Sequence, residues 1–436
     1  MVDQAKLDRT HTVPDASNVT RHVLANGLVV LVRENHSSPS VVVSGYLRCG
    51  ALHETPAQAG LSSFVSTMLR RGTTTRTFAE INETLEAVGA SIGIGGGRHI
   101  TDFGGKSLTE DLDLMLEILA DVLRHPVFPA EHIEKVRGQI LTGLQERDND
   151  TRSMASLAFR TALYGQDHPY GRSLAGEKET ILPIQQDDLQ TFYRSYYGPT
   201  GGAIVLVGDV QTDRVIARID ALLGDWTNPS TAIEGVLPTI PALATIERRS
   251  IPIAGKTQTD LVLGCVGPLR QSPHYYPAAV GNTILGRFGM MGRLGDNVRE
   301  KQGLAYYAYS ALEAGEGPGP WMAIAGVSPA TVARTIDSIV HEIERMREEL
   351  VADEELTDSQ AFMTGVLPLR LETNQGVADT LSDIERFGLG LDYLNRYPDF
   401  INQVTAAEIR AAAQQYLTLD AYVVGISGPP ELEPTM

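Results

Sequence analysis

The segment 292–310 holds the side chains best suited to chemistry, an arginine and a tyrosine seven residues apart. Arg299 is predicted to end a helix, Gly303 to turn the chain and Tyr306 to begin a strand, so that the arginine and tyrosine side chains converge. A guanidinium and a phenol are hydrogen-bond donors suited to a carbonyl oxygen, or to the negative oxygen that forms when a carbonyl is attacked. Because a strand alternates its faces, Tyr307 is a second candidate that cannot point the same way as Tyr306.

A helix predicted after Gly60 carries hydroxyl groups where metal ligands would be expected. Residues 60–73 read Gly-Leu-Ser-Ser-Phe-Val-Ser-Thr-Met-Leu-Arg-Arg-Gly-Thr. This stretch resembles the active-site segment of the pitrilysin/insulinase-type zinc peptidases, the M16 family, whose active members read Gly-x-x-His-Phe-x-Glu-His-Met-x-x-x-Gly-Thr. Ser63 and Thr67 take the places of the two histidines, and Ser66 takes the place of the catalytic glutamate. Hydroxyl groups supply neither zinc ligands nor a base for a metal-bound water.

The third zinc ligand implied by the resemblance is also missing. In the family it is a glutamate on a later helix, eight residues before a proline, and the matching position in this sequence is Gly143, counted back from Thr151. Glu146 is no substitute, because three helical residues rotate it by about 300° around the axis. We therefore expect Ser63, Ser66, Thr67 and Gly143 to mark a degenerate zinc site, and no metal to bind in this chain.

The resemblance covers about residues 20 to 430, and residues 299–306, Arg-Glu-Lys-Gln-Gly-Leu-Ala-Tyr, are its most specific match. Some enzymes of the M16B subclass are heterodimers, in which one subunit holds zinc and the other lacks the motif but supplies an arginine and a tyrosine. The resemblance implies that this chain is the second kind of subunit. Arg299 and Tyr306 would then act on an unfolded peptide in the zinc site of an M16 paralogue, and the chain would be inactive alone.

Two other functions stay open at this point. One is a structural scaffold of the same fold, like the core subunits of respiratory bc1 complexes, and the other is a peptide-binding homodimer without catalysis. Co-purification separates the three, because each predicts a different companion: a zinc-motif paralogue, a membrane assembly or a second copy of the chain. An autonomous metallopeptidase is disfavoured by the four substitutions.

The remaining histidines and acids are weaker candidates. His341 and Glu344 lie in a charge-rich helix that is expected to be a solvated face, and His53 with Glu54 is expected to be a surface pair. A ligand donated by His168, in the loop His-Pro-Tyr-Gly, is the less favoured interpretation of that loop.

Composition excludes several classes of protein. The chain has 436 residues and a net charge of −18, which argues against a binder of nucleic acid or of anionic membranes. Apolar runs fall short of the ~18 residues of a membrane span, and the first residues lack a signal-peptide core. A cytoplasmic location follows, or a periplasmic one if a signal peptide has been removed. Cys49 and Cys265 are expected to be buried and free.

Two halves of the sequence repeat one plan of strands and helices, which indicates a domain duplication. A helix containing Leu112 to Val122 follows an apparent capping box at 107–110, and a second helix follows Ser328. We predict an α+β fold with two duplicated αβ-sandwich domains of the LuxS/MPP-like kind, each a mixed, mainly antiparallel sheet with helices packed on one face. The predicted parts are a flexible start, an N-terminal domain, a linker and a C-terminal domain, at 1–20, 21–227, 228–246 and 247–436.

Overall fold

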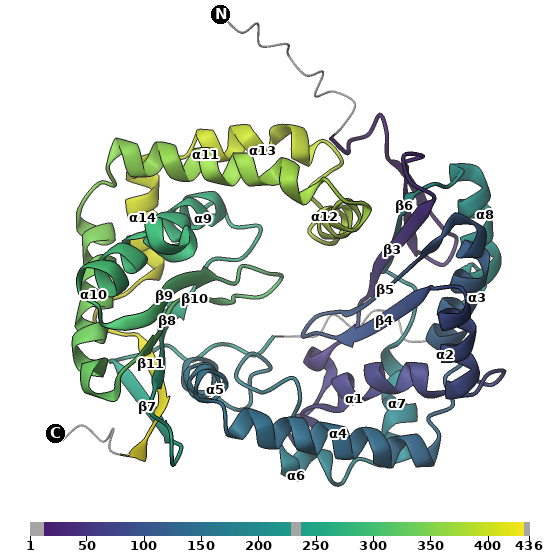
Figure 1. Cartoon of the computed structure of the whole chain (residues 1–436), viewed down its shortest axis with the longest axis horizontal. Helices are drawn as coiled ribbons and strands as arrows, with labels where there is room; N and C mark the ends of the chain where they lie inside the picture. The colour runs from purple at the N-terminus through teal and green to yellow at the C-terminus, as the bar shows by residue number, and fades with distance from the viewer. Residues whose placement is uncertain (1–12, 228–236, 431–436) are drawn as a thin grey trace, which may run out of the picture. The chain divides into compact units, whose positions relative to one another are not determined.

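The computed structural model describes residues 13–227 and 237–430, which form two mixed β-sheets with many helices (Figure 1). Most of the predicted flexible start and about half of the predicted linker lie outside the described residues. Contacts divide the chain into two compact units. Unit 1 comprises Met1–Ile140, Leu174–Val236 and Val366–Pro398, and unit 2 comprises Leu141–Ser173, Leu237–Gly365 and Asp399–Met436. The units follow the sequence only in part, because each takes in a segment from the other half of the chain.

Unit 1 contains a six-stranded sheet in the order β1-β2-β6-β3-β5-β4. Its strands are β1 (Thr20–Val23), β2 (Val29–Glu34), β3 (Ser40–Leu47), β4 (Ser91–Gly96), β5 (Thr101–Leu108) and β6 (Ala203–Gly208). Strands β2 and β6 are parallel, and the other neighbours are antiparallel. The central strand β6 reads Ala-Ile-Val-Leu-Val-Gly and is buried throughout, as expected for a strand covered on both faces.

Unit 2 contains a five-stranded sheet in the order β7-β11-β8-β10-β9. Its strands are β7 (Glu247–Pro252), β8 (Thr259–Val266), β9 (Ala305–Leu312), β10 (Pro320–Val327) and β11 (Val423–Gly428). Strands β7 and β11 are parallel and the other pairs antiparallel, so the pattern of unit 1 returns once β1 is set aside. The duplication and the mixed, mainly antiparallel sheets are confirmed, and β4 and β9 are equivalent strands at the ends of their sheets.

One face of the unit 1 sheet carries α3 (Leu112–Arg124) and α8 (Thr212–Leu223), and α1 (Leu61–Met68) packs on β4. The opposite face is covered by α12 (Asn374–Arg386), which comes from the second half of the sequence and packs on β3 and β6 (Figure 1). The further helices wholly or partly in this unit are α2 (Phe78–Ala87), α4 (Ala130–Asp148), α6 (Lys178–Ile181), α7 (Gln186–Tyr196) and α13 (Tyr393–Asn402).

Unit 2 repeats this arrangement. Helices α9 (Tyr275–Asn282), α10 (Val332–Glu348) and α14 (Ala406–Tyr416) pack together beside the sheet, and α11 (Asp353–Arg370) begins in this unit. Helix α5 (Thr151–Tyr164), from the first half of the sequence, packs on β7, β8 and β11. Ala155 and Phe159 of α5 form a core with Val262, Met322 and Val423 of the sheet.

Two local predictions have different outcomes. The helix after Ser328 is confirmed as α10, preceded by a 3-10 turn at Pro329–Thr331. The capping box at 107–110 is wrong: Ser107 is a buried residue of β5, and α3 begins at Leu112 after a 3-10 turn. The β-strand continues through the serine because its neighbours pair with β3 up to Leu108.

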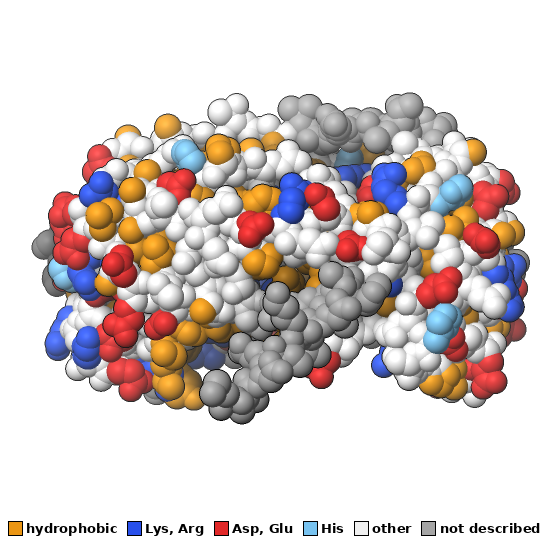
Figure 2. All heavy atoms as spheres, turned by 90° about the horizontal axis from the view of Figure 1, so that it is seen from above, with side chains coloured by type: hydrophobic (Ala, Val, Ile, Leu, Met, Phe, Trp, Pro, Cys, Tyr) orange, Lys and Arg blue, Asp and Glu red, His pale blue; other side chains and the backbone are white. Residues whose placement is uncertain are grey.

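Several predictions from composition can be compared with the structure. Both cysteines are buried and free, as predicted, and burial raises the pKa of the Cys49 thiol to about 12. Among the described residues, no helix combines the length and apolarity needed to cross a bilayer. Acidic and basic side chains are interspersed over the face shown in Figure 2, with acidic residues outnumbering basic ones by 54 to 36 in the sequence.

Candidate functional site

Helix α1 carries three of the four positions that the sequence predicts to mark a degenerate zinc site, and a buried carboxylate fixes its start. Gly60, with φ +95°, precedes the helix, and Glu54 accepts hydrogen bonds from the backbone N–H groups of Gly60 (3.2 Å) and Ser62 (2.5 Å). A carboxylate at a helix N-terminus satisfies free N–H groups and complements the helix dipole. The predicted surface pair His53–Glu54 is therefore wrong for Glu54, which is 7% exposed.

The hydroxyl groups of α1 turn toward their own helix. Ser66 Oγ and Thr67 Oγ1 both donate to the backbone carbonyl of Ser63, at 2.9 Å each, in the local pattern common for hydroxyl side chains in helices. Ser66 is 2% exposed, whereas Thr67 is exposed and Ser63 is partly buried. The end of β4 passes close by, since a Cβ on Gly96 would lie 3.1 Å from Ser66 Oγ.

Gly143, the fourth position of the predicted degenerate site, lies on α4. It is exposed, and a Cβ placed there would meet nothing within 4 Å. The four residues do not fit a zinc ion, because zinc in proteins is held by thiolate, imidazole or carboxylate groups and none of the four provides one. Within residues 13–227 and 237–430, no cluster of three His, Cys, Asp or Glu side chains could hold a metal ion.

Arg299 lies near the end of the π-helical segment η8 (Gly295–Lys301), in unit 2. Gly303, with φ +60°, closes the helix end: its N–H donates to the Arg299 carbonyl (3.1 Å), and the N–H of Leu304 donates to that of Val298 (3.0 Å). The predicted helix end, turn and strand start are confirmed. The Arg299 side chain is 41% exposed, with Nε 3.5 Å from Glu300 Oε1, an ion pair too exposed to hold it firmly.

Tyr306 is the extra residue of a β-bulge in β9. In the register with β10, Tyr307 faces Gly326 and Ala305 faces Val327, so that Tyr306 has no opposite residue. A bulge re-aims the side chain of its unpaired residue, and Tyr306 is 80% exposed. The ring of Tyr307 takes the other direction, and its hydroxyl donates to the buried carboxylate of Asp260. The two tyrosines therefore differ in direction, as predicted, and Tyr306 is the accessible one.

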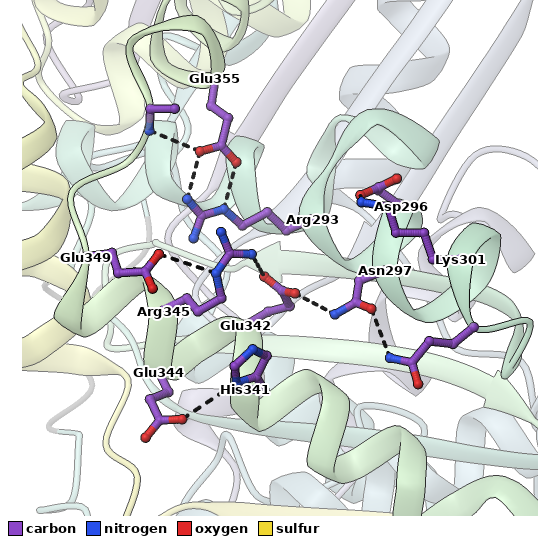
Figure 3. A network of polar contacts seen from close by, with 12 residues as sticks. Arg293, Asp296, Asn297, Lys301, His341, Glu342, Glu344, Arg345, Glu349 and Glu355 are labelled. Carbon is purple, nitrogen blue, oxygen red and sulfur yellow. Dashed lines mark hydrogen bonds and ion pairs between the residues drawn. The ribbon is translucent and has the colours of Figure 1, made fainter.

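Segment η8 is tied to α10 by a polar network, drawn in Figure 3. Asn297 of η8 donates to the carboxylate of Glu342 (2.5 Å), which also accepts from Arg345 (3.0 Å). Just before η8, the guanidinium of Arg293 makes two 2.7 Å hydrogen bonds to Glu355 at the start of α11. Because η8 packs against β9, the network and the strand together fix the elements that carry Arg299 and Tyr306.

The other histidine candidates behave as structural residues. His341 and Glu344 form an exposed pair at 3.7 Å, which confirms a solvated face for those two. Glu342 of the same helix departs from the predicted solvated face, since its side chain is 3% exposed and belongs to the network. His168 is 2% exposed and stacks on Tyr164, and its Nδ1 accepts from the N–H of Tyr170 (3.0 Å), so the imidazole is part of an aromatic core.

Comparison with known proteins identifies the family of this chain. Residues 29–178 match the model of the insulinase family, peptidase family M16, and residues 183–363 match the model described as the peptidase M16 inactive domain. The chain belongs to peptidase family M16. Similar curated members are named uncharacterized zinc proteases. That of Streptomyces coelicolor is 26% identical over 92% of this chain and 87% of its own length. The uncharacterized zinc protease YmxG of Bacillus subtilis is 25% identical over 94% of this chain and 98% of its own length.

Two solved structures have the same fold as this chain. The peptidase M16 inactive domain from Pseudomonas fluorescens is 26% identical and aligns with a TM-score of 0.86 over 94% of this chain and 98% of its own. A protease from Helicobacter pylori, 19% identical, aligns with a TM-score of 0.86 over 96% and 100% of the two chains. The family assignment and the predicted fold class are both confirmed, except that helices cover both faces of the unit 1 sheet, where the sequence predicted helices on one face.

Proposed function

We propose that this chain is the non-zinc-binding subunit of an M16B-type heterodimeric zinc metallopeptidase, with a zinc-motif-bearing M16 paralogue as its partner. Arg299 and Tyr306 bind the unfolded peptide substrate and stabilise the oxyanion that forms in the partner's site. Zinc belongs to the partner subunit in this proposal, and the cytoplasm is the proposed location. The matches of residues 29–178 and 183–363 to two models of family M16 support the peptidase part of this proposal.

The observation that carries the proposal is the exposure of Tyr306. Tyrosine is normally intermediate in burial, yet the bulge holds this one 80% exposed at the end strand of the unit 2 sheet. Arg299, on the element that packs against this strand, is also accessible. The elements that carry the two donors are braced, and both side chains remain open to a carbonyl oxygen of an incoming peptide, where donors of this kind stabilise a developing negative charge.

The test is reconstitution with a zinc-motif paralogue from the same genome and an assay of an unstructured peptide. Tyr306→Phe or Arg299→Ala should lower turnover about 100-fold, the effect of losing roughly 3 kcal/mol of transition-state stabilisation, while complex formation stays intact. Arg334→Ala, at an exposed arginine of α10, and Tyr276→Phe, at a tyrosine stacked on Phe400, are matched controls that should keep full activity.

Two results would contradict the proposal. Full activity of both Tyr306→Phe and Arg299→Ala in the complex would leave the chain as a structural or peptide-binding scaffold, the alternative that the sequence left open. Peptide cleavage by the purified chain alone, with about one zinc ion per chain, would instead make it an autonomous peptidase.

A further inference from the structure

A tyrosine, a glycine and an aspartate lie in one row across three strands of the unit 2 sheet. Gly326 of β10 is in register with both Asp260 of β8 and Tyr307 of β9. Because the middle residue has no side chain, the Tyr307 ring can cross it, and its hydroxyl donates to Asp260 Oδ1. The space is fully used, since a Cβ on Gly326 would lie 2.8 Å from the Cζ atom of Tyr307.

Asp260 at the end of this row is buried and receives several donors. It is 2% exposed, and besides Tyr307 it accepts hydrogen bonds from the hydroxyl of Thr151, the first residue of α5, and from Gln258 Nε2 (3.1 Å). The Arg152 guanidinium lies 4.3 Å from the centroid of the Tyr307 ring. Burial and the hydrogen bond to Asp260 raise the pKa of Tyr307, so that this phenol stays neutral and remains a donor.

The row ends where the bulge begins. The register shift lies between Gly326 and Val327, directly beside the residue on which the Tyr307 ring rests. On the other side of the bulge, Ala305 is 9% exposed and again paired with β10. With Tyr307 drawn across the sheet and Ala305 buried, the residue between them is left outside the ladder.

We infer that Asp260 is a positioning residue for Tyr306. By holding the hydroxyl of Tyr307 across Gly326, it fixes the register that forces the intervening tyrosine outward. The inference rests on the proposed function for its effect on catalysis, but the anchoring of the bulge can be measured in the isolated chain. Asp260 itself touches no substrate in this scheme, and it acts through Tyr307 and the strand.

The experiment uses Tyr307→Phe and Asp260→Asn, each of which alters the hydrogen bond while keeping the shape of the side chain. In the isolated full chain, amide hydrogen exchange of residues 305–308 should rise at least tenfold in both variants. The matched control is Tyr309→Phe, because Tyr309 is on the same strand and near the same Arg152 (5.7 Å) but donates no hydrogen bond to Asp260. Its exchange should match that of the parent.

A double-mutant cycle in the reconstituted complex separates positioning from general damage. Tyr307→Phe alone should lower the turnover number at least tenfold with little change in KM. In the Tyr306→Phe background it should have almost no further effect, because the side chain that it positions is already disabled. Unchanged exchange in both Tyr307→Phe and Asp260→Asn, or losses of turnover that multiply in the double variant, would overturn the inference. If Tyr306→Phe alone leaves turnover unaltered, the proposed function fails, and the exchange measurement then decides the anchoring by itself.

Discussion

Strands β4 and β9 occupy the same place in the duplicated sheets, yet the exposed side chains of the two strands differ. β4 reads Ser-Ile-Gly-Ile-Gly-Gly, and a Cβ on Gly93 or Gly95 would meet nothing within 4 Å. β9 reads Ala-Tyr-Tyr-Ala-Tyr-Ser-Ala-Leu and holds Tyr306 outward through a bulge. The exposed side of β4 is therefore glycine backbone at two positions, whereas β9 exposes the phenol of Tyr306 at a bulge.

The helical segments that pack on these two strands differ in the same way. On α1, beside β4, the hydroxyls of Ser66 and Thr67 donate hydrogen bonds to the backbone carbonyl of Ser63. On η8, beside β9, Arg299 remains accessible while Asn297 takes up the contact with Glu342. The difference teaches that one duplicated frame can keep its packing in both copies while only one copy keeps donors available for chemistry.

The largest expected effect concerns the network behind η8. Arg293→Ala removes the two hydrogen bonds that Arg293 donates to Glu355 and leaves the one from the Ala352 N–H, and losing the buried partner of this pair, which is 6% exposed, costs about 3 kcal/mol of unfolding free energy. Urea unfolding measures the loss. Arg21→Ala is the matched control, because Arg21 also makes a two-bond pair, with Glu385, but its side chain is 42% exposed. It should cost less than about 1 kcal/mol. Equal losses would mean that the network does not brace η8 in particular.

A smaller effect is expected on α1. Ser66→Glu restores the residue type of active relatives at a position that is 2% exposed and close to Gly96, so we expect a loss of about 2 kcal/mol from overpacking. Thr67→Glu adds the same side chain one residue later, where the helix is exposed, and should change stability by less than about 0.5 kcal/mol. Thermal and urea unfolding compare the two. A neutral Ser66→Glu would show that α1 still has room for a catalytic carboxylate.

The smallest expected effect is a pH dependence in the network. Hydrogen bonds from Arg293 hold the pKa of Glu355 below its ordinary value of 4.5. A group with a lowered pKa in the folded state stabilises the protein above its unfolded-state pKa, and this contribution disappears as the pH falls through the folded-state value. Glu355→Gln should therefore flatten the loss of stability below about pH 4.5. Glu344→Gln, the same substitution at an exposed residue of α10 that pairs with His341, serves as the control.

Much of the frame could be predicted from the sequence. The duplication, the mixed sheets, the free cysteines and the turn at Gly303 follow from local patterns, because apolar strands, caps and glycines with positive φ act over a few residues. Residues 60–73 and 299–306 predict the family, because their spacing matches its motifs even where other residue types stand at the expected ligand positions.

The residues that brace the site could not be predicted. Glu342 shares the buried face of α10 with Ile339 and Met346, and its carboxylate is accommodated there by the contact with Asn297 of η8, which the sequence does not reveal. Asp260 and Tyr307 lie 47 residues apart, and their contact depends on the register of three strands. Glu54 lies in a loop, where a charged residue is expected at the surface. Its burial follows from capping a helix that starts several residues later, a contact that local sequence does not indicate.

The helices α5 and α12 have a consequence for how the polypeptide could be divided. α5 precedes residue 227 but supplies Ala155 and Phe159 to the core around Val262 and Met322, whereas α12 follows residue 247 but covers β3 and β6. A fragment ending near the middle of the chain would expose the apolar face that its missing helix covers. Neither half of the chain is therefore expected to fold alone. Truncation at the centre would yield insoluble fragments, and only co-expression of the two halves would restore soluble protein.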